Sequence, residues 1–111
     1  MAGRIARGDV RLVAFPHPDK ARPAVVLTLD RVINHLATVT IAPITSTIRS
    51  VPSEVALDVE DGMKAPCVVN LQNVQTVSQS LLGKRVAQLT EARMEEICRA
   101  LRFALGCGGL H

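Results

Sequence analysis

The sequence predicts a mainly β protein with some α structure: a small, strongly bent sheet or barrel with one amphipathic helix at its C-terminal end. Short segments between residues 8 and 89 alternate apolar and polar side chains or are rich in β-branched residues, and both patterns are typical of strands. Residues 90–106 instead carry apolar side chains at helical spacing. Several short strands followed by a single helix are typical of a small barrel with the helix packed on it.

Five segments are predicted to form strands, and they are separated by loops of distinct composition. The predicted strands are 8–15, 24–29, 37–44, 54–59 and 81–89, while residues 67–77 set an apolar run with buried character beside amide side chains. Residues 16–23 contain three prolines, which supply no N–H to a sheet, and therefore predict a loop. Residues 45–53 are rich in Ser and Thr and predict a second loop. Residues 30–36 are compatible with one helical turn.

The C-terminal helix has the clearest signals at both ends. Its apolar stripe consists of Met94, Ile97, Cys98, Leu101, Ala104 and Leu105. Thr90 is suited to be the N-cap, and Gly106 stands where a helix commonly ends in the left-handed conformation. These features predict a helix between the two residues.

Length, composition and charge indicate one globular domain over residues 1–111. Apolar residues make up 48% of the chain, which is enough for a folded core. The net charge is +3, with +4 in residues 1–49 (seven Lys/Arg, three Asp) and −1 in residues 50–111 (six Lys/Arg, seven Asp/Glu). A basic N-terminal half fits a polyanionic partner, and it also fits charges that are merely solvated.

Several classes of site and location are disfavoured by the sequence. Three cysteines without a CxxC pair indicate reduced thiols, and no His/Cys/carboxylate cluster has metal-ligand spacing. No phosphate-binding glycine motif is present, so we expect neither a metal nor a cofactor. We expect a cytoplasmic protein, because the chain shows no signal peptide and no apolar run long enough to span a membrane.

The two polar loops hold the residues best suited to bind phosphate. Each loop adjoins an apolar strand, and together they offer His17, Lys20, Arg22, Thr45, Ser46, Thr47 and Arg49. Guanidinium and hydroxyl groups donate hydrogen bonds to phosphate oxygens. The alternative is that the Ser/Thr side chains only form turns with their own backbone.

Four features, in this order and spacing, resemble the MazF/PemK (Kid) family of toxin endoribonucleases. They are RGDV at 7–10, RPAVVL at 22–27, APITS at 42–46 and the C-terminal helix. The resemblance implies an SH3-like barrel of the MazF/CcdB type and a homodimer. It also implies a type II toxin–antitoxin system, in which the disordered tail of a cognate antitoxin covers the RNA groove. The implied activity is metal-independent cleavage of single-stranded RNA at short sequence motifs.

The resemblance assigns roles to individual residues. The family's arginine before proline falls on Arg22, and its motif threonine falls on Thr45. This chain departs from relatives in its short 16–23 loop and in Arg11, which replaces a common aromatic residue. Asn70 and Gln72 stand where certain relatives carry an arginine and an aspartate.

The implied reaction is attack of a ribose 2′-OH on the adjacent phosphorus, giving a 2′,3′-cyclic phosphate (or 3′-phosphate) and a 5′-OH. We expect Arg22 to stabilise the phosphoryl charge, Thr45 to donate to the phosphate or orient the 2′-OH, and His17 to transfer protons. The expected substrate-binding residues are Lys20, Ser46, Thr47, Arg49, Asn70 and Gln72. The alternatives are a CcdB-like toxin that binds gyrase without catalysis and an RNA-binding module that does not cut.

Overall fold

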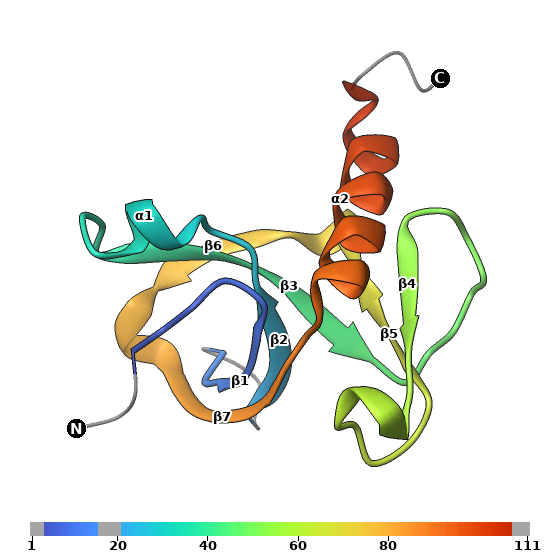
Figure 1. The fold of residues 1–111 in the computed structure, drawn as a ribbon, viewed down its shortest axis with the longest axis horizontal. Coiled ribbons are helices and arrows are strands. Elements are labelled where there is room, and N and C mark those ends of the chain that lie inside the picture. Colours follow the sequence, from blue (N-terminus) through green and yellow to red (C-terminus); the bar gives the residue numbers. More distant parts are fainter. Residues whose placement is uncertain (1–3, 16–20, 108–111) are drawn as a thin grey trace.

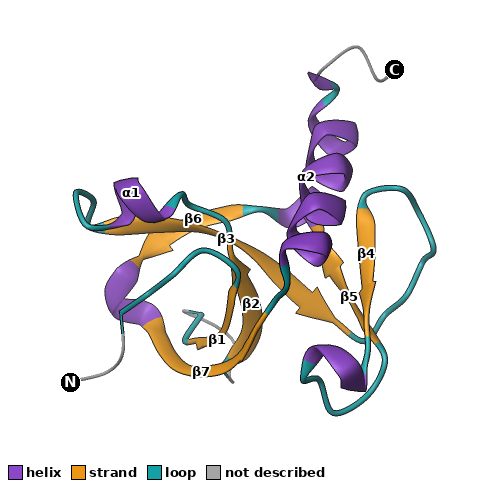
Figure 2. Cartoon of the chain, viewed as in Figure 1, coloured by secondary structure: helices purple, strands orange, loops and turns teal. Residues whose placement is uncertain are grey.

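Short strands and one long helix make up the structure, a computed structural model that describes residues 4–15 and 21–107 (Figure 1). The strands are β1 (Asp9–Val13), β2 (Arg22–Val26), β3 (Thr38–Thr45), β4 (Glu54–Leu57), β5 (Cys67–Asn70), β6 (Gln75–Ser78) and β7 (Leu82–Gln88). The α-helices are α1 (Asp30–Ile33) and α2 (Glu91–Leu105), and the 3-10 turns are η1 (Val59–Asp61), η2 (Leu71–Asn73) and η3 (Gln79–Leu81). Figure 2 shows that strands dominate and that α2 is the one long helix of the described residues.

The seven strands form one bent antiparallel sheet in the order β4-β5-β3-β2-β1-β7, with β6 also paired to β3. Strand β3 is the centre of this arrangement, because it pairs with β2, β5 and β6. Strands β1, β2, β3, β6 and β7 curve into a ring, while β4 and β5 extend to one side (Figure 1). Within the described residues no ladder joins β6 to β7, so the ring is barrel-like without closing. This architecture confirms the predicted small β-barrel with a terminal helix.

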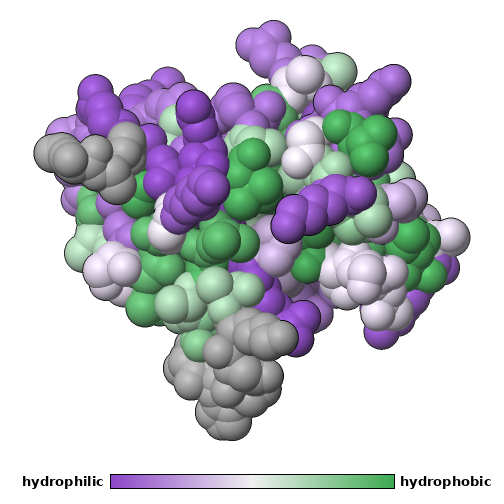
Figure 3. Space-filling model, turned by 90° about the horizontal axis from the view of Figure 1, so that it is seen from below, coloured by the Kyte–Doolittle hydropathy of each residue, from purple (hydrophilic) through white to green (hydrophobic). Residues whose placement is uncertain are grey.

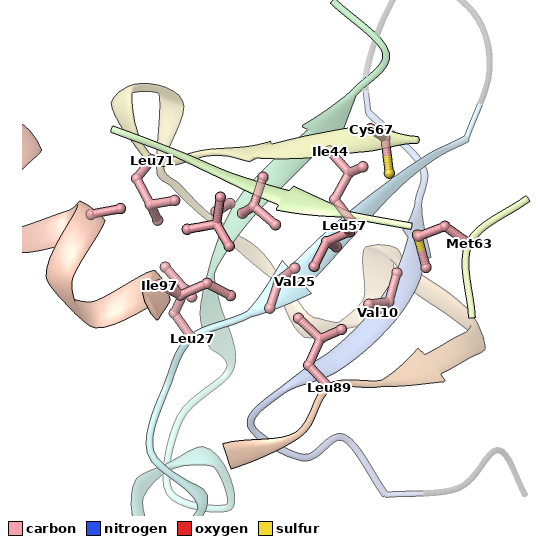
Figure 4. Close-up of a cluster of buried hydrophobic side chains, with 14 residues drawn as sticks. Val10, Val25, Leu27, Ile44, Leu57, Met63, Cys67, Leu71, Leu89 and Ile97 are labelled. Carbon is pink, nitrogen blue, oxygen red and sulfur yellow. The ribbon is translucent and has the colours of Figure 1, made fainter. Parts of the chain in front are cut away.

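The hydrophobic core has two parts, one on each face of the sheet. The first fills the ring and consists of Val13, Ala24, Val26, Ile33, Val39 and Ile41. The second lies between α2 and the strands (Figure 4), with Val10, Val25, Leu57, Leu71, Leu89 and Ile97 among its members. Strand β2 therefore contributes apolar side chains to both cores, and this explains its nearly continuous apolar sequence.

Helix α2 begins and ends as predicted, but one residue of its predicted apolar stripe is exposed. The Thr90 hydroxyl oxygen accepts a hydrogen bond from the Arg93 N–H at 3.2 Å, and Gly106 has a φ of +71°. Ile97 and Ala100 are its buried residues, whereas Leu105, predicted in the apolar stripe, is 67% exposed. The reason is that the C-terminal end of α2 projects beyond the sheet, where no described layer covers it (Figure 1). No helix in the described part of the chain has the length and apolar character required to cross a bilayer.

The boundaries of two strands correct the sequence prediction. Pro23 was expected in a loop over residues 16–23, yet it lies in β2 opposite Leu12. Pro43 was expected near the end of its strand, yet β3 continues to Thr45. Pro23 is tolerated because it is the second residue of β2, where its missing N–H leaves the rest of the ladder intact. Residues 67–77, for which the sequence indicated only a buried apolar run, contain most of two strands, β5 and β6, separated by η2.

A buried ion pair occupies the start of β1. Asp9 is completely buried, Arg11 is 4% exposed, and Arg11 Nη2 lies 3.0 Å from Asp9 Oδ2. The guanidinium also donates to the carbonyl oxygens of Gly83 at 3.0 Å and Arg4 at 2.9 Å. The side-chain amide of Gln88 donates to the other Asp9 oxygen. This network joins the N-terminal segment to β1 and β7 through buried electrostatic contacts.

We predict that Asp9→Ala lowers the free energy of unfolding by about 3–5 kcal/mol, because it leaves a buried guanidinium without its counter-charge. Urea denaturation at neutral pH measures this loss. Glu60→Ala removes an exposed carboxylate and is the matched control, with an expected change within about 0.5 kcal/mol. Equal stability of the Asp9 variant and the wild type would contradict the structural role of this pair.

A second ion pair fastens α2 to η1. Arg93 Nε lies 2.9 Å from Asp61 Oδ1, and Arg93 Nη2 lies 3.1 Å from Asp61 Oδ2. The hydrogen bond from Arg93 lowers the pKa of the Asp61 carboxyl below its ordinary value of 3.8, against the opposing effect of burial. The same bond raises the pKa of Arg93. The pair therefore stabilises the fold whenever Asp61 is ionised.

We predict that Asp61→Asn destabilises the protein by about 1–3 kcal/mol at neutral pH, because a hydrogen bond to a charged group is lost. The folded-state pKa is lower than the unfolded one, so this contribution is complete above the ordinary value of 3.8. It is lost as the pH falls through the lower folded-state pKa. Urea unfolding between about pH 6 and about pH 2 should show the two proteins converging at the acid end. A difference that stays constant with pH would exclude this role for Asp61.

Candidate active site

Arg22 and Thr45 lie at neighbouring ends of two paired strands. Strands β2 and β3 are antiparallel, with Ala24 opposite Pro43 and Val26 opposite Ile41. Continued by two residues, this register sets Arg22, the first residue of β2, opposite Thr45, the last residue of β3. Residues directly opposite in an antiparallel pair project to the same face, with Cβ atoms roughly 5 Å apart. The extended register thus places a guanidinium and a hydroxyl that are far apart in sequence at neighbouring strand ends.

The Arg22 side chain is available to an external ligand. It is exposed, and among the described residues its guanidinium has no hydrogen-bond or ion-pair partner. Its backbone is held in β2, opposite Val13 of β1, and Pro23 restricts the next residue. A fixed backbone and a free planar cation together are suited to bind a phosphate through two parallel hydrogen bonds.

Thr45 is partly exposed and uses its hydroxyl oxygen locally. Its Oγ1 accepts a hydrogen bond from the Thr47 N–H at 3.1 Å. The turn that the sequence offered as the alternative reading is therefore present. A hydroxyl also carries one proton to donate, and the local bond leaves that proton free for a ligand. The turn and a role in phosphate binding are compatible, because the turn orients the hydroxyl.

The same face of the sheet continues from Thr45 across β5 to β4. Thr45 is opposite Val68, and Val68 is opposite Ala56. Two residues farther along β5, roughly 7 Å, Asn70 is opposite Glu54. The side chains of Asn70 and Glu54 therefore project to the same side of the sheet as Thr45.

The other predicted site residues lie in the loop after β3, at η2 or outside the described part of the chain. Ser46, Thr47 and Arg49 follow β3 in an exposed loop. Asn70 Oδ1 accepts the Gln72 N–H at 2.9 Å and caps η2, so its oxygen is engaged while its NH₂ group remains to donate. Gln72 is exposed on η2, beyond the end of β5. His17 and Lys20 lie outside the described residues.

A separate hollow of about 550 Å³ lies along α2. Arg7, Glu91, Cys98 and Arg102 are among the residues that line it. Arg7 joins this region to the sheet, since its guanidinium donates to the Leu27 carbonyl and lies 3.2 Å from the Cys98 sulfur. The hollow contains neither Arg22 nor Thr45, so it is distinct from the candidate site.

Metal ligation and thiol chemistry have little support in the described part of the chain. No group of three or more His, Cys, Asp or Glu side chains there is arranged to hold a metal ion. Burial raises the pKa of the Cys67 thiol, and the charges of Asp61 and Asp58 raise it further. A thiol with a raised pKa is a poor nucleophile at neutral pH, so Cys67 acts as a core residue.

The sequence analysis missed Glu54, which contacts the loop after Thr45. One of its carboxylate oxygens accepts backbone N–H groups from Arg49 and Ser50, both at 3.0 Å. The only sequence signal was its position as the first residue of a strand that follows a Ser/Thr-rich loop.

Comparison with known proteins decides the family. The family description "PemK-like, MazF-like toxin of type II toxin-antitoxin system" matches residues 6–105. The chain belongs to this family. It is 41% identical over 103 residues to the probable endoribonuclease MazF5 of Mycobacterium tuberculosis, covering 92% of this chain and 94% of that protein.

Two solved structures of PemK/MazF-like proteins share the fold. The M. tuberculosis toxin MazF-mt6 superposes with a TM-score of 0.82 at 33% identity, covering 89% of this chain and 97% of that one. An endoribonuclease from a mycobacterial species, solved in complex with its cognate antitoxin, gives a TM-score of 0.83 at 29% identity, covering 93% and 96%. The predicted family and the MazF-type barrel are therefore confirmed.

Proposed function

We propose that Arg22 and Thr45 carry out the RNA cleavage that makes this chain an endoribonuclease toxin of a type II toxin–antitoxin system. The observation that supports the proposal is the β2–β3 register. Extended by two residues, it sets Arg22, whose guanidinium has no partner among the described residues, opposite the turn-oriented hydroxyl of Thr45. The reaction proposed for the site is metal-independent cleavage of single-stranded RNA at a short sequence motif. Residues 1–111 form its single toxin domain, acting in the cytoplasm.

In this mechanism the ribose 2′-oxygen forms a bond to phosphorus while the bond to the 5′-oxygen breaks. The 2′-OH loses its proton, the departing 5′-oxygen gains one, and the products carry a 2′,3′-cyclic phosphate and a 5′-OH. Negative charge grows on the two non-bridging phosphoryl oxygens in the transition state. Arg22 stabilises that charge through its N–H groups, and it does not shuttle protons because guanidinium stays protonated.

Thr45 donates its hydroxyl proton to the same phosphate or orients the attacking 2′-OH. Its turn with Thr47 fixes the direction of the hydroxyl before RNA binds. The acid–base role is proposed for His17, because an imidazole ordinarily titrates near pH ~6.5. Lys20, Ser46, Thr47, Arg49, Asn70 and Gln72 are proposed to bind the strand on either side of the scissile phosphate.

A homodimer and a cognate antitoxin are the proposed protein partners. The described part of the chain leaves large apolar side chains uncovered, including Phe103 (44% exposed) and Leu105 (67%) on the projecting end of α2. Figure 3 shows apolar and hydrophilic groups interspersed over another face of the molecule. Phe103 and Leu105 are proposed to contribute to an association surface at this end of α2. A structural relative bound to its antitoxin supports the second partner.

We predict that Arg22→Ala lowers the cleavage rate of single-stranded RNA in EDTA by about 10²–10³-fold, as expected for a donor to developing charge. Its unfolding free energy should change by less than about 0.5 kcal/mol, because the side chain is exposed and has no partner in the part of the chain that the structure describes. Primer extension on a mixed-sequence RNA measures cleavage, and urea denaturation measures stability. Arg31→Ala removes another exposed arginine and should cut normally. An Arg22 variant that cuts at the wild-type rate refutes the assignment.

For Thr45, we expect the Val variant to cut about tenfold slower or worse and the Ser variant to keep most of the activity. Valine preserves the β-branched shape and removes the hydroxyl, whereas serine retains the hydroxyl. Single-turnover rates on one RNA oligonucleotide compare the two variants. Equal rates for Thr45→Val and wild type would remove Thr45 from the reaction.

The wild-type protein also tests the two alternative functions. RNA binding without cleavage would favour an RNA-binding module, and inhibition of gyrase without cleavage would favour a CcdB-like toxin.

A further inference from the structure

The loop between β3 and β4 is exposed along most of its length and anchored at its end. Residues 46–52 are all exposed, whereas Ser53 is 2% exposed. The Ser53 carbonyl accepts the Leu71 N–H at 2.9 Å, which fixes the end of the loop to η2. The loop begins directly after Thr45, so its conformation determines what surrounds the candidate site.

Glu54 clamps the middle of this loop. A single carboxylate oxygen, Glu54 Oε1, accepts the N–H groups of Arg49 and Ser50, both at 3.0 Å. Ser50 has a φ of +57°, a left-handed conformation that is unfavourable for residues other than glycine. Hydrogen bonds to an ionised group are roughly twice as strong as those between neutral groups. The carboxylate therefore stabilises a backbone conformation that the loop sequence itself disfavours.

The clamp leaves the Arg49 side chain free. A carboxylate beside an arginine commonly forms an ion pair with it, yet here Glu54 binds the Arg49 backbone N–H. Within the described residues the Arg49 guanidinium has no hydrogen-bond or ion-pair partner, and the residue is exposed. Its backbone is thus held in place while its charge remains available to an anion.

The clamp and Thr45 belong to one face of the sheet. Thr45 is opposite Val68, Val68 is opposite Ala56, and Glu54 precedes Ala56 by two residues in the same strand. Side chains two residues apart in a strand project to the same side. The loop consequently begins at the face that carries Thr45, and Glu54 holds it at the same face. A strand of RNA bound at this face would pass along the loop.

We propose that Glu54 is a positioning residue, which fixes Arg49 to bind a phosphate of the RNA strand flanking the scissile linkage. The inference rests on the proposed function and extends it to substrate binding. Because Arg49 acts away from the reacting atoms, Glu54 contributes to the affinity for RNA and leaves the chemical step to Arg22 and Thr45.

The test compares KM and kcat of Glu54→Ala and Glu54→Gln on a single-stranded RNA oligonucleotide that the wild type cleaves. Alanine removes the acceptor, so KM should rise about tenfold with kcat nearly unchanged. Glutamine keeps a carbonyl oxygen for both N–H groups and should restore most of the affinity. Glu60→Ala, the loss of an exposed carboxylate outside the loop, controls for the change in net charge.

The second part of the test uses the Arg49→Ala variant. It should raise KM and lower the slope of log KM against log salt by about 0.7, the value for one phosphate contact on a single strand. In the Arg49→Ala background, Glu54→Ala should add little, because the two residues act through one contact.

Three results would each overturn the proposal. The first is a wild-type KM for Glu54→Ala, and the second is an undiminished rise in KM when Glu54→Ala is added to the Arg49→Ala variant. The third is a wild-type KM and salt slope for Arg49→Ala. The last result decides the matter even if Glu54→Ala fails to fold. Failure of the proposed function is recognised separately, since the wild type would then leave the RNA intact.

Discussion

The pairing of β2 with β3 is the constraint on which the candidate site depends. A slip of one residue in this register would turn every side chain of one strand to the opposite face. Such a slip is strongly disfavoured because β2 is buried on both sides, with Val25 in the core beneath α2 and Ala24 and Val26 in the core of the ring. Two independent cores thus fix one register, and that register sets Arg22 opposite Thr45.

The charged groups of the described chain divide into those that hold the fold and those that are free for a ligand. Asp9 with Arg11, and Asp61 with Arg93, are ion pairs with little exposed carboxylate. The first pair lies within β1 and is bonded to Arg4, Gly83 and Gln88, whereas the second joins η1 to α2. Arg22 is exposed and without a partner among the described residues. Breaking a buried pair costs stability, whereas an exposed unpaired cation contributes little to it. Stability and RNA cleavage can therefore be tested separately.

Two residues at which the sequence departs from the expected family pattern, Arg11 and Asn70, make structural hydrogen bonds. Arg11, at the position where the family resemblance implies an aromatic residue, is buried within a hydrogen-bonded network. Asn70, in place of a charged residue of certain relatives, caps η2 with its side-chain oxygen. Asn70 and Gln72 are amides, which do not transfer protons at neutral pH, so the proposed acid–base role stays with His17.

The sequence by itself determined the elements whose signals are local. The C-terminal helix between Thr90 and Gly106 and the alternating strands follow from capping, left-handed glycine and period-two patterns, all of which act over a few residues. The order of short motifs was sufficient to indicate the family and, through it, Arg22 and Thr45.

Only the tertiary structure decided which distant groups meet. The burial of Arg11 depends on carbonyls from two other segments, and the exposure of Leu105 depends on where the sheet beneath α2 ends. The strand position of Pro23 depends on its pairing with Leu12. Glu54 accepts a hydrogen bond from the loop that precedes it, and no periodicity or capping pattern in the sequence predicts this contact. Local patterns set the conformation of a segment, but register and packing between segments arise only when the whole chain is folded.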